Sequence, residues 1–384
     1  MDQEQKTLKH SVPELFRDFR SELTVYSPGR INMIGEHTDY NNGFVLPTAI
    51  NKKIVLQFNK NSSAHTCNVY SNTYDKSLSF DLRKIKISTE QWENYILGVV
   101  DEIQKQGKNL QGFDCYIESN LSVGAGISSS AALECGIAVG LNDLFNLGLD
   151  RKTIAELSRD AEHNFVGTKC GIMDQYASVL SKAGHFILLD CKTLDASYIP
   201  AHFEGYKILL LNTQVSHSLA ESEYNTRRDE CEKVVQIIKD KYPGITSLRD
   251  IDLNILETFK DQISGIQFRR VQYVLKENIR VLDAVEAIKA GDLKEFGKLM
   301  YQSHSGLKED YEVSCKELDF LVDFSTNFES ILGASMMGGG FGGCTINLIK
   351  EAFVAEFISL ATQAYSEKFN IEIQAIEALP EEGT

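Results

Sequence analysis

Apolar and polar positions change period along the chain, so the sequence predicts both strands and helices. Residues 113–118 alternate between apolar and polar side chains, the two-residue period of a half-buried strand. Between Leu133 and Leu144 the apolar residues recur at helical spacing. The same patterns predict further strands at Lys53–Phe58, His185–Asp190, Tyr206–Asn212, Cys344–Ile349 and Ile371–Ile376. They predict long helices at Thr153–His163, Leu219–Lys239, Ile266–Ala290 and Asp292–Ser303. This mixture favours an α+β or α/β fold over a helix bundle or a β-sandwich.

The length of 384 residues corresponds to two or three domains. The chain is 43% hydrophobic and 24% charged, which is ordinary for a globular enzyme and excludes a disordered or fibrous chain. Pro200 and Gly205 follow the predicted strand at His185–Asp190. We therefore expect a domain boundary within Cys191–Gly205, with one domain at 1–195 and the other at 196–384.

Net charge and targeting signals narrow the classes of partner. With 39 Lys and Arg against 54 Asp and Glu, the net charge is −15, so we expect no nucleic acid and no anionic membrane as partner. The charged N-terminus lacks the apolar core of a signal peptide. Eight cysteines are spaced in no zinc or thioredoxin pattern, and we expect buried thiols in a reducing cytoplasm.

A Gly/Ser loop, Ser122–Ser130, separates the predicted strand from the predicted helix. Such a loop exposes backbone N–H groups at the positive end of the helix dipole, where an anion binds. It is neither a Walker A loop nor a dinucleotide fingerprint. The pattern fits a phosphate site and, equally well, a Ser-rich helix N-cap.

Strong hydrogen-bonding groups gather within Gly29–Tyr40. These groups belong to Arg30, Asn32, Glu36, His37 and Asp39. Ionised carboxylates accept paired hydroxyl donors, so this segment suits a polyol such as a sugar. A metal site formed by Glu36, His37 and Asp39 is a second reading. A solvated turn leading into residues 41–43 is the third.

A glycine-rich segment, Gly333–Gly343, precedes the predicted strand at Cys344–Ile349. Five glycines in the six positions 338–343 forbid regular structure and allow close backbone approach. A flexible hairpin or linker is the alternative, although linkers are polar and this segment contains Met336, Met337 and Phe341.

Two single carboxylates also stand out. Glu162 ends the predicted helix Thr153–His163, and Asp174 lies within the apolar segment Cys170–Gln175. An aspartate among apolar neighbours is unfavourable unless it is partnered or functional. The alternative for Asp174 is a helix N-cap.

Together these stretches resemble the GHMP kinase superfamily and, more closely, its galactokinases, over nearly the whole chain. Gly29–Tyr40 resembles the galactokinase signature, Gly124–Ala132 the phosphate loop of the superfamily, and Met336–Cys344 its third motif. Ser216–Tyr224 and Glu162–Gln175 resemble further galactokinase segments. Because all five occur in the order of the family, the resemblance is specific.

The resemblance implies an α+β fold of two GHMP kinase domains. The N-terminal domain would resemble ribosomal protein S5 domain 2, and the C-terminal domain would be ferredoxin-like. The active site would lie in the cleft between them, and the last few residues are expected to return to the N-terminal domain.

The resemblance also implies roles for individual residues. Asp174 matches the catalytic aspartate that faces the C1 hydroxyl of the sugar, and Arg30 matches the arginine beside it. This cation keeps the carboxylate ionised and makes it a weaker base, which a loose phosphoryl-transfer transition state tolerates. The positions of magnesium ligands are Ser130 and Glu162. The positions of sugar contacts are Glu36, His37, Asp39, Gly171 and Tyr224. The ATP-binding positions are Gly124, Ala125, Gly126, Ile127, Ser128, Ser129 and Ser130, with Trp92 near the adenine, unless Trp92 is a core residue.

The activity that the resemblance implies is transfer of the γ-phosphoryl group of ATP to the C1 hydroxyl of α-D-galactose, with Mg2+, in a cytoplasmic monomer. A related sugar-1-kinase for N-acetylgalactosamine or arabinose is the near alternative, because an N-acetyl group needs space at C2. A non-catalytic galactose sensor on the same scaffold is the distant one. A sensor would be favoured by a damaged phosphate loop or a missing base, whereas Ser130, Glu162 and Asp174 are all present.

Overall fold

The computed structural model describes residues 12–121, 124–201, 203–216 and 220–384. The charged N-terminus lies outside these ranges. Further predictions fall partly outside them: the glycine loop at residues 122 and 123, the expected domain boundary at residue 202, the fourth segment at residues 217–219, and the predicted helix Leu219–Lys239 at its first residue. The α-helices are α1 (Gln91–Lys105), α2 (Ser129–Phe145), α3 (Arg151–Ala161), α4 (Met173–Leu180), α5 (Ala220–Lys239), α6 (Leu253–Glu257), α7 (Gly265–Lys289), α8 (Leu293–Glu309), α9 (Lys316–Ser325) and α10 (Val354–Phe369). Short helical turns are η1 (Glu14–Phe16), η2 (Asp39–Asn41), η3 (Glu162–Val166), η4 (Leu248–Asp250) and η5 (Glu351–Phe353).

Three sheets organise the chain. The first, six-stranded, has the order β1-β3-β6-β4-β5, with β13 paired to β3; the second is β10-β11-β9-β12, and the third is β2-β7-β8. The strands are β1 (Leu23–Asn32), β2 (Phe44–Val45), β3 (Pro47–Lys60), β4 (Thr66–Ser71), β5 (Lys76–Asp81), β6 (Phe113–Ser119), β7 (His185–Asp190), β8 (Asp195–Pro200), β9 (Tyr206–Ser216), β10 (Ile331–Met336), β11 (Gly342–Lys350), β12 (Gln374–Ala378) and β13 (Pro380–Glu381). Neighbouring strands run antiparallel except for β4 and β6, which are parallel.

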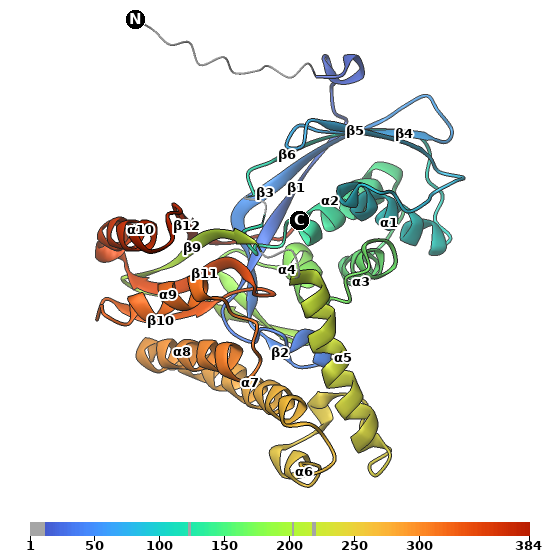
Figure 1. Ribbon diagram of the computed structural model, residues 1–384. Coiled ribbons are helices and arrows are strands. Elements are labelled where there is room, and N and C mark those ends of the chain that lie inside the picture. The colour runs from blue at the N-terminus through green and yellow to red at the C-terminus, as the bar shows by residue number, and fades with distance from the viewer. Residues whose placement is uncertain (1–11, 122–123, 202, 217–219) are drawn as a thin grey trace, which may run out of the picture.

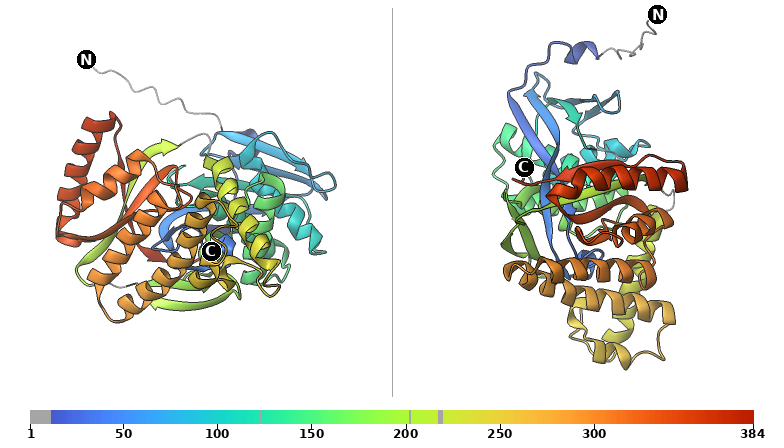
Figure 2. Two further views of the ribbon diagram at one scale, coloured as in Figure 1. Left: turned by 60° about the horizontal axis from the view of Figure 1, so that its bottom comes forward. Right: turned by 90° about the vertical axis from the view of Figure 1, so that its left-hand side faces the viewer.

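Helices cover the sheets in two groups. Helices α2 and α4 pack on β1 and β3, with α1 and α3 outside them, while α8 and α9 pack on the second sheet. Helices α5 and α6 and the N-terminal part of α7 form a helical projection away from both sheets, whereas the C-terminal part of α7 joins the main apolar cluster and α7 packs along α8 (Figures 1 and 2). The largest apolar cluster contains residues of both sheets, such as Leu56 and Leu348. The two sheets therefore share one core.

The C-terminus returns to the first sheet. Strand β13 pairs with β3, and the Thr384 hydroxyl lies 2.8 Å from that of Ser27 on β1. The predicted division at residues 195 and 196 stays a prediction. The second sheet is formed entirely by strands that follow it, because β9 begins at Tyr206.

The predicted strands are confirmed, with one shift. Strand β12 begins at Gln374, three residues after the prediction, because Ile371 and Ile373 pack in the connection from α10 rather than in the sheet. The predicted alternation of β6 is also incomplete. Asp114 is buried, and its carboxylate accepts hydrogen bonds from the amides of Asn61 and Asn68.

Two predicted helices end elsewhere. Helix α8 continues past Ser303 to Glu309, because Gly306 lets it pack closely against Tyr273. Helix α3 ends at Ala161 and is followed by the π turn η3, which begins at Glu162. A π turn within a helix often marks a functional site.

All eight cysteines are free thiols. Six of them are buried, so the prediction of buried hydrophobic residues is confirmed for these six.

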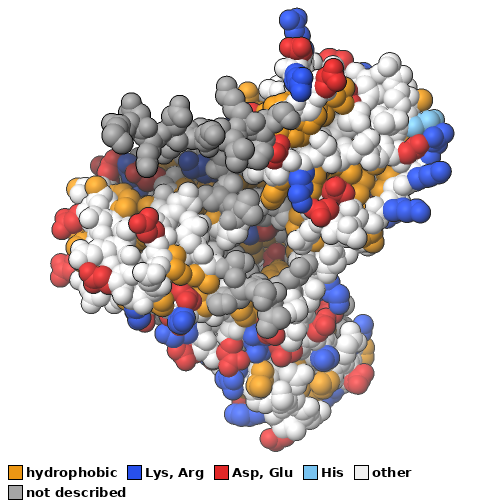
Figure 3. All heavy atoms as spheres, turned by 45° about the horizontal axis from the view of Figure 1, so that its top comes forward, with side chains coloured by type: hydrophobic (Ala, Val, Ile, Leu, Met, Phe, Trp, Pro, Cys, Tyr) orange, Lys and Arg blue, Asp and Glu red, His pale blue; other side chains and the backbone are white. Residues whose placement is uncertain are grey.

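Among the described residues, no helix is long and apolar enough to cross a membrane. The surface is hollowed near the middle of the view in Figure 3, and acidic side chains lie in the hollow.

Candidate active site

The centre of the site is an ion pair between Arg30 on β1 and Asp174 on α4. Arg30 Nε and Nη2 donate to the two carboxylate oxygens of Asp174, each at 2.7 Å, and Nη1 donates to the carbonyl of Gly126 at 2.6 Å. The arginine is 5% exposed. Burial lowers the pKa of its guanidinium, but the charge and hydrogen bonds of Asp174, together with the charges of Glu36 and Asp39, outweigh this effect and the pKa is raised.

Asp174 is not a helix cap. The residue at the N-cap of α4 is Ile172, and Asp174 lies in the first turn with its carboxylate turned to Arg30. A third donor, the Ser128 hydroxyl, lies 2.7 Å from Asp174 Oδ2. Asp174 is thus partnered, as an aspartate in an apolar segment must be.

The glycine loop gives α2 an uncapped beginning. Ser128 occupies the N-cap in the left-handed region (φ +59°), and its side chain caps no N–H group because it is bonded to Asp174. The Ser-rich N-cap reading is therefore wrong for Ser128. Gly124 and Gly126 also have positive φ, which glycine adopts without strain. Among the residues that the structure describes, no side chain is found to cap the first turn of α2, which leaves its N–H groups for an anion.

Two members of the predicted ATP-binding set are core residues. The side chains of Ala125 and Ile127 are 1% exposed and belong to the main apolar cluster. The Ile127 carbonyl accepts the backbone N–H of Arg30. These two residues therefore shape the loop from inside.

The signature segment is buried, so it is not a solvated turn. Glu36 and His37 are each 3% exposed, and Asp39 is 8% exposed. Glu36 Oε1 accepts the N–H of Gly338, and His37 Nε2 donates to the carbonyl of Gly339 at 3.2 Å. Since that carbonyl only accepts, Nε2 holds the proton, and Nδ1 can accept from the hydroxyl of Tyr40 at 2.7 Å. Both ring nitrogens are occupied, which argues against His37 as a metal ligand.

Burial shifts the titration of all three side chains. It raises the pKa of Glu36 to about 8, against the opposing effect of Arg30. It lowers the pKa of His37 to about 3, so the imidazole is neutral. Burial, assisted by the charge of Asp174, raises the pKa of Asp39 to about 6.

The third motif closes on the other two. Residues 337–341 form the turn between β10 and β11, and both Met336 and Met337 are buried. The prediction that the glycines forbid regular structure is wrong for Gly342 and Gly343, which belong to β11. The backbone of Gly338 bonds to Glu36, and a Cβ on Gly338 would lie 3.2 Å from the carbonyl of Gly126. The glycines were predicted to let the backbone come close to another group. The groups that it approaches are the signature segment and the phosphate loop.

These segments enclose a cavity of about 120 Å³, the sugar-side cavity. The residues that line it are Arg30, Glu36, His37, Asp39, Glu162, Thr168, Cys170, Met173, Asp174, Tyr224, Gly338 and Gly339. Every predicted catalytic residue and four of the five predicted sugar contacts are among them. The fifth, Gly171, packs directly on Asp39, because a Cβ there would lie 2.0 Å from Asp39 Oδ2.

A second cavity, of about 440 Å³, adjoins the start of α2. Trp92, Tyr74 and Leu133 line it together with Ser129 and Ser130. Trp92 is 8% exposed, so it belongs to the core and to the cavity wall at once. The start of α2 thus borders both cavities, since Ser128 bonds to Asp174 while the next two serines face the other space.

Comparison with known proteins agrees with this geometry. Family models match at residues 14–60 (galactokinase galactose-binding signature), 94–182 (GHMP kinases N-terminal domain) and 284–366 (GHMP kinases C-terminal). A galactokinase of Thermosipho africanus is 43% identical over 91% of this chain and 95% of its own length. This chain belongs to the galactokinase family. A further galactokinase, from Clostridium acetobutylicum, is 40% identical over 91% of both chains.

Solved structures of this family and its relatives have the same fold. The structure of Lactococcus lactis galactokinase complexed with galactose matches with a TM-score of 0.90 and 33% identity, over 94% of both chains. A mevalonate kinase from Methanococcus jannaschii shares the fold, with a TM-score of 0.65 and 20% identity over 94% of this chain and 98% of its own. The predicted two-domain GHMP kinase fold is confirmed.

Two side chains of this galactokinase-family chain offer oxygen atoms of the type that binds a magnesium ion. Ser130 offers a hydroxyl at the start of α2, and Glu162 offers a carboxylate at the start of η3; Mg2+ prefers oxygen ligands and retains several waters. They line the two neighbouring cavities. The described residues contain no group of three or more His, Cys, Asp and Glu side chains arranged for a metal.

Sequence reasoning missed a buried carboxylate next to this site. The amide of Gln175 donates to Glu162 Oε2 at 2.9 Å and to Glu134 Oε2 at 3.1 Å. Glu134 is fully buried, and burial, together with the charge of Glu162, raises its pKa well above the usual value. The signal was a charged residue within the apolar run of the α2 helix.

Proposed function

We propose that this protein transfers the γ-phosphoryl group of ATP to the C1 hydroxyl of α-D-galactose, giving α-D-galactose 1-phosphate and ADP. The observation that supports this most is the bidentate Arg30–Asp174 pair in a cavity lined by the signature side chains. The related Lactococcus lactis galactokinase was solved with galactose.

In the proposed reaction the C1 oxygen attacks the γ-phosphorus, and the bond to the ADP oxygen breaks. The hydroxyl proton passes to the Asp174 carboxylate as the new bond forms. A loose transition state asks little of the nucleophile before this late proton loss, so a carboxylate held by a guanidinium suffices. Arg30 also stabilises the charge on the transferring group.

The remaining residues bind and orient the two substrates. The carboxyl groups of Glu36 and Asp39 form hydrogen bonds with sugar hydroxyls, and Tyr224 from α5 forms a wall beside them. The free N–H groups at the start of α2 hold the ATP phosphates. Ser130 and Glu162 would hold Mg2+, which when bound neutralises phosphate charge.

The proposal also includes the oligomeric state of the enzyme and the compartment in which it acts. The oligomeric state stays a prediction, and we expect the enzyme to act as a monomer. Eight free thiols support a reducing compartment such as the cytoplasm.

The decisive experiment is a coupled ADP-release assay with galactose, N-acetylgalactosamine, glucose and arabinose. The proposal expects the highest kcat/KM with galactose. A higher value with another of these sugars would assign the chain to a related sugar-1-kinase, and no turnover with any of them, despite galactose binding, would make it a sensor.

A further inference from the structure

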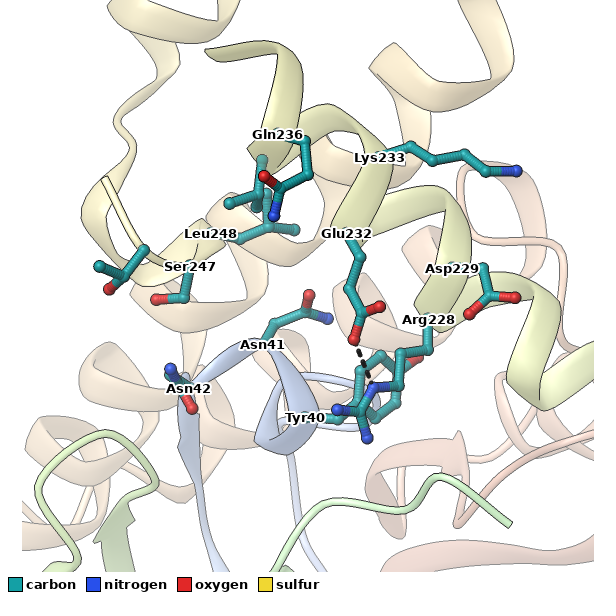
Figure 4. A pocket seen from close by; sticks show the side chains of 12 residues that line it. Tyr40, Asn41, Asn42, Arg228, Asp229, Glu232, Lys233, Gln236, Ser247 and Leu248 are labelled. Carbon is teal, nitrogen blue, oxygen red and sulfur yellow. Dashed lines mark hydrogen bonds and ion pairs between the residues drawn. The ribbon is translucent and has the colours of Figure 1, made fainter. Parts of the chain in front are cut away.

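A cavity of about 500 Å³ lies outside the sugar-side cavity, between α5, η4 and the back of η2; we call it the η2 pocket. Its lining residues are Tyr40, Asn41, Asn42, Arg228, Asp229, Glu232, Lys233, Val235, Gln236, Thr246, Ser247 and Leu248 (Figure 4). Its volume is typical of small-molecule sites, which span roughly 300–1,000 Å³. None of the roles discussed so far uses it.

Some polar groups of this pocket are held in ion pairs and others are left without a partner in the described part of the chain. Arg228 Nε donates to Glu232 at 2.8 Å, and Asp229 pairs with Lys169 at 3.2 Å. The side chains of Asn42 and Gln236 form no hydrogen bond with any described residue. In Figure 4, Gln236 and Glu232 point into the space that Asn41 faces from the opposite side.

This lining defines the chemistry of an occupant. Lys233 also lines the pocket and forms no ion pair with a described residue, but it extends away from the space in Figure 4, so no cluster of cations faces a phosphate or a nucleotide. The amides and a carboxylate offer both donors and acceptors. The apolar floor of Val235 and Leu248, with the ring of Tyr40, suits the C–H faces of a sugar. These features match a neutral, polyhydroxylated ligand of one or two rings.

The pocket shares its walls with the sugar-side cavity. Asn41 donates to the backbone carbonyl of His37 at 2.9 Å. Arg228 Nη1 donates to the carbonyl of Lys169 at 2.8 Å, immediately before Cys170. Asp39 begins the η2 turn whose next residues line the pocket. A ligand that fixes η2 and Arg228 therefore also fixes groups that line the sugar-side cavity.

We propose that the η2 pocket binds a neutral sugar or polyol, and that its occupancy strengthens galactose binding. The first claim, that the pocket binds such a ligand, depends only on the structure of the pocket. The second claim, the coupling, rests on the proposed function, because it is observed through the KM for galactose.

Sucrose is a suitable probe, because it is neutral, has two rings and has no free anomeric hydroxyl to be phosphorylated. Calorimetry with the protein saturated with galactose should give one saturable site with a Kd below about 10 mM. Gln236→Trp fills the pocket and should weaken this binding at least tenfold. Asn42→Gly should weaken it while keeping the left-handed backbone (φ +58°). The matched control is Lys239→Trp, on the same helix but outside the pocket, which should bind as wild type does.

In the kinetic assay, saturating sucrose should lower the galactose KM about fivefold in wild type and leave it unchanged in Gln236→Trp. A raised KM would indicate competition in the sugar-side cavity and would overturn the coupling. The proposed site would be overturned if sucrose binding did not saturate, or if the folded variants Gln236→Trp and Asn42→Gly bound sucrose as wild type does. Binding of inorganic phosphate in place of sucrose would also overturn it. Sucrose binding by a protein that does not phosphorylate galactose would keep the site and overturn the proposed function.

Discussion

Arg30 and Asp174 are 144 positions apart in the chain, yet two nitrogens of the arginine contact both oxygens of the aspartate at 2.7 Å. The third contact of the same guanidinium is the carbonyl of Gly126 in the glycine loop. A planar bidentate pair fixes orientation as well as distance. One buried side chain thus aligns the proposed base with the proposed phosphate site.

Glu162→Gln should raise the Mg2+ concentration needed for half-maximal activity and leave galactose affinity nearly unchanged, because only the metal loses a ligand. The measurement is a Mg2+ titration of kcat at saturating substrates. Glu156→Gln, on the preceding helix and outside the cavities, is the control. An unchanged Mg2+ dependence would leave Glu162 as a structural partner of Gln175.

Asp39→Ala should raise the KM for galactose far more than the KM for ATP. A charged acceptor bonded to a sugar hydroxyl contributes roughly 1.5–3 kcal/mol, or about 10- to 150-fold. Since the pKa of Asp39 is raised to about 6, kcat/KM for galactose in wild type should fall as the pH drops through 6, and Asp39→Asn should lose this limb. An equal rise in both KM values would instead mean that the turn before Asn41 is misfolded.

Gly171→Ala tests the close approach of the backbone to Asp39. The new Cβ would lie 2.0 Å from Asp39 Oδ2, so the carboxylate must move. We expect the galactose KM to rise at least about tenfold, the lower end of the loss of one charged hydrogen bond. Gly244→Ala is the control, because a Cβ there meets nothing within 4 Å. A KM within twofold of wild type would show that Asp39 adapts without loss.

Glu36 should make the free protein less stable at alkaline pH. Its pKa is raised to about 8 in the folded state, against 4.5 as the ordinary value, so the folded state binds the extra proton between these pH values. Unfolding free energy therefore falls as the pH rises and levels off above 8. His37 acts in the opposite direction, but only below about 6.5, since its pKa is lowered to about 3.

The clean window for this test is pH 6.5 to 8.0. Over these 1.5 units wild type should lose about 2 kcal/mol more unfolding free energy than Glu36→Gln. Urea unfolding of both proteins at the two pH values measures the difference. Parallel losses in the two proteins would show that Glu36 is ionised throughout.

Much of the site could be predicted from local sequence. The side chains of Gly29–Tyr40 and the glycine loop were grouped correctly, because their chemistry lies within short segments. The partners of those side chains could not be predicted. Ser128 has the sequence context of a cap, but its hydroxyl bonds to Asp174, 46 positions away. Gln175 on α4 joins Glu134 on α2 to Glu162 on η3, and only tertiary packing brings these three elements together.

The sequence predicted which strands and helices the fold contains better than it predicted where each one begins and ends. Strand periodicity placed β7 at its observed bounds, whereas the apolar residues Ile371 and Ile373 extended the prediction for β12 into a packed connection. Helix α8 outlasts its prediction because Gly306, a helix-weakening residue, is accommodated by contact with Tyr273. Such contacts are tertiary, so no local pattern contains them.

The most direct test of the account is kcat for Asp174→Asn, with Asp160→Asn on α3 as the control. The change is nearly isosteric and removes both the charge and the proton acceptor. Because general-base assistance contributes about 10²- to 10⁴-fold, kcat should fall at least a hundredfold while both KM values stay near wild type. A kcat within about tenfold of wild type would contradict Asp174 as the base and leave Arg30 and substrate positioning to account for the rate.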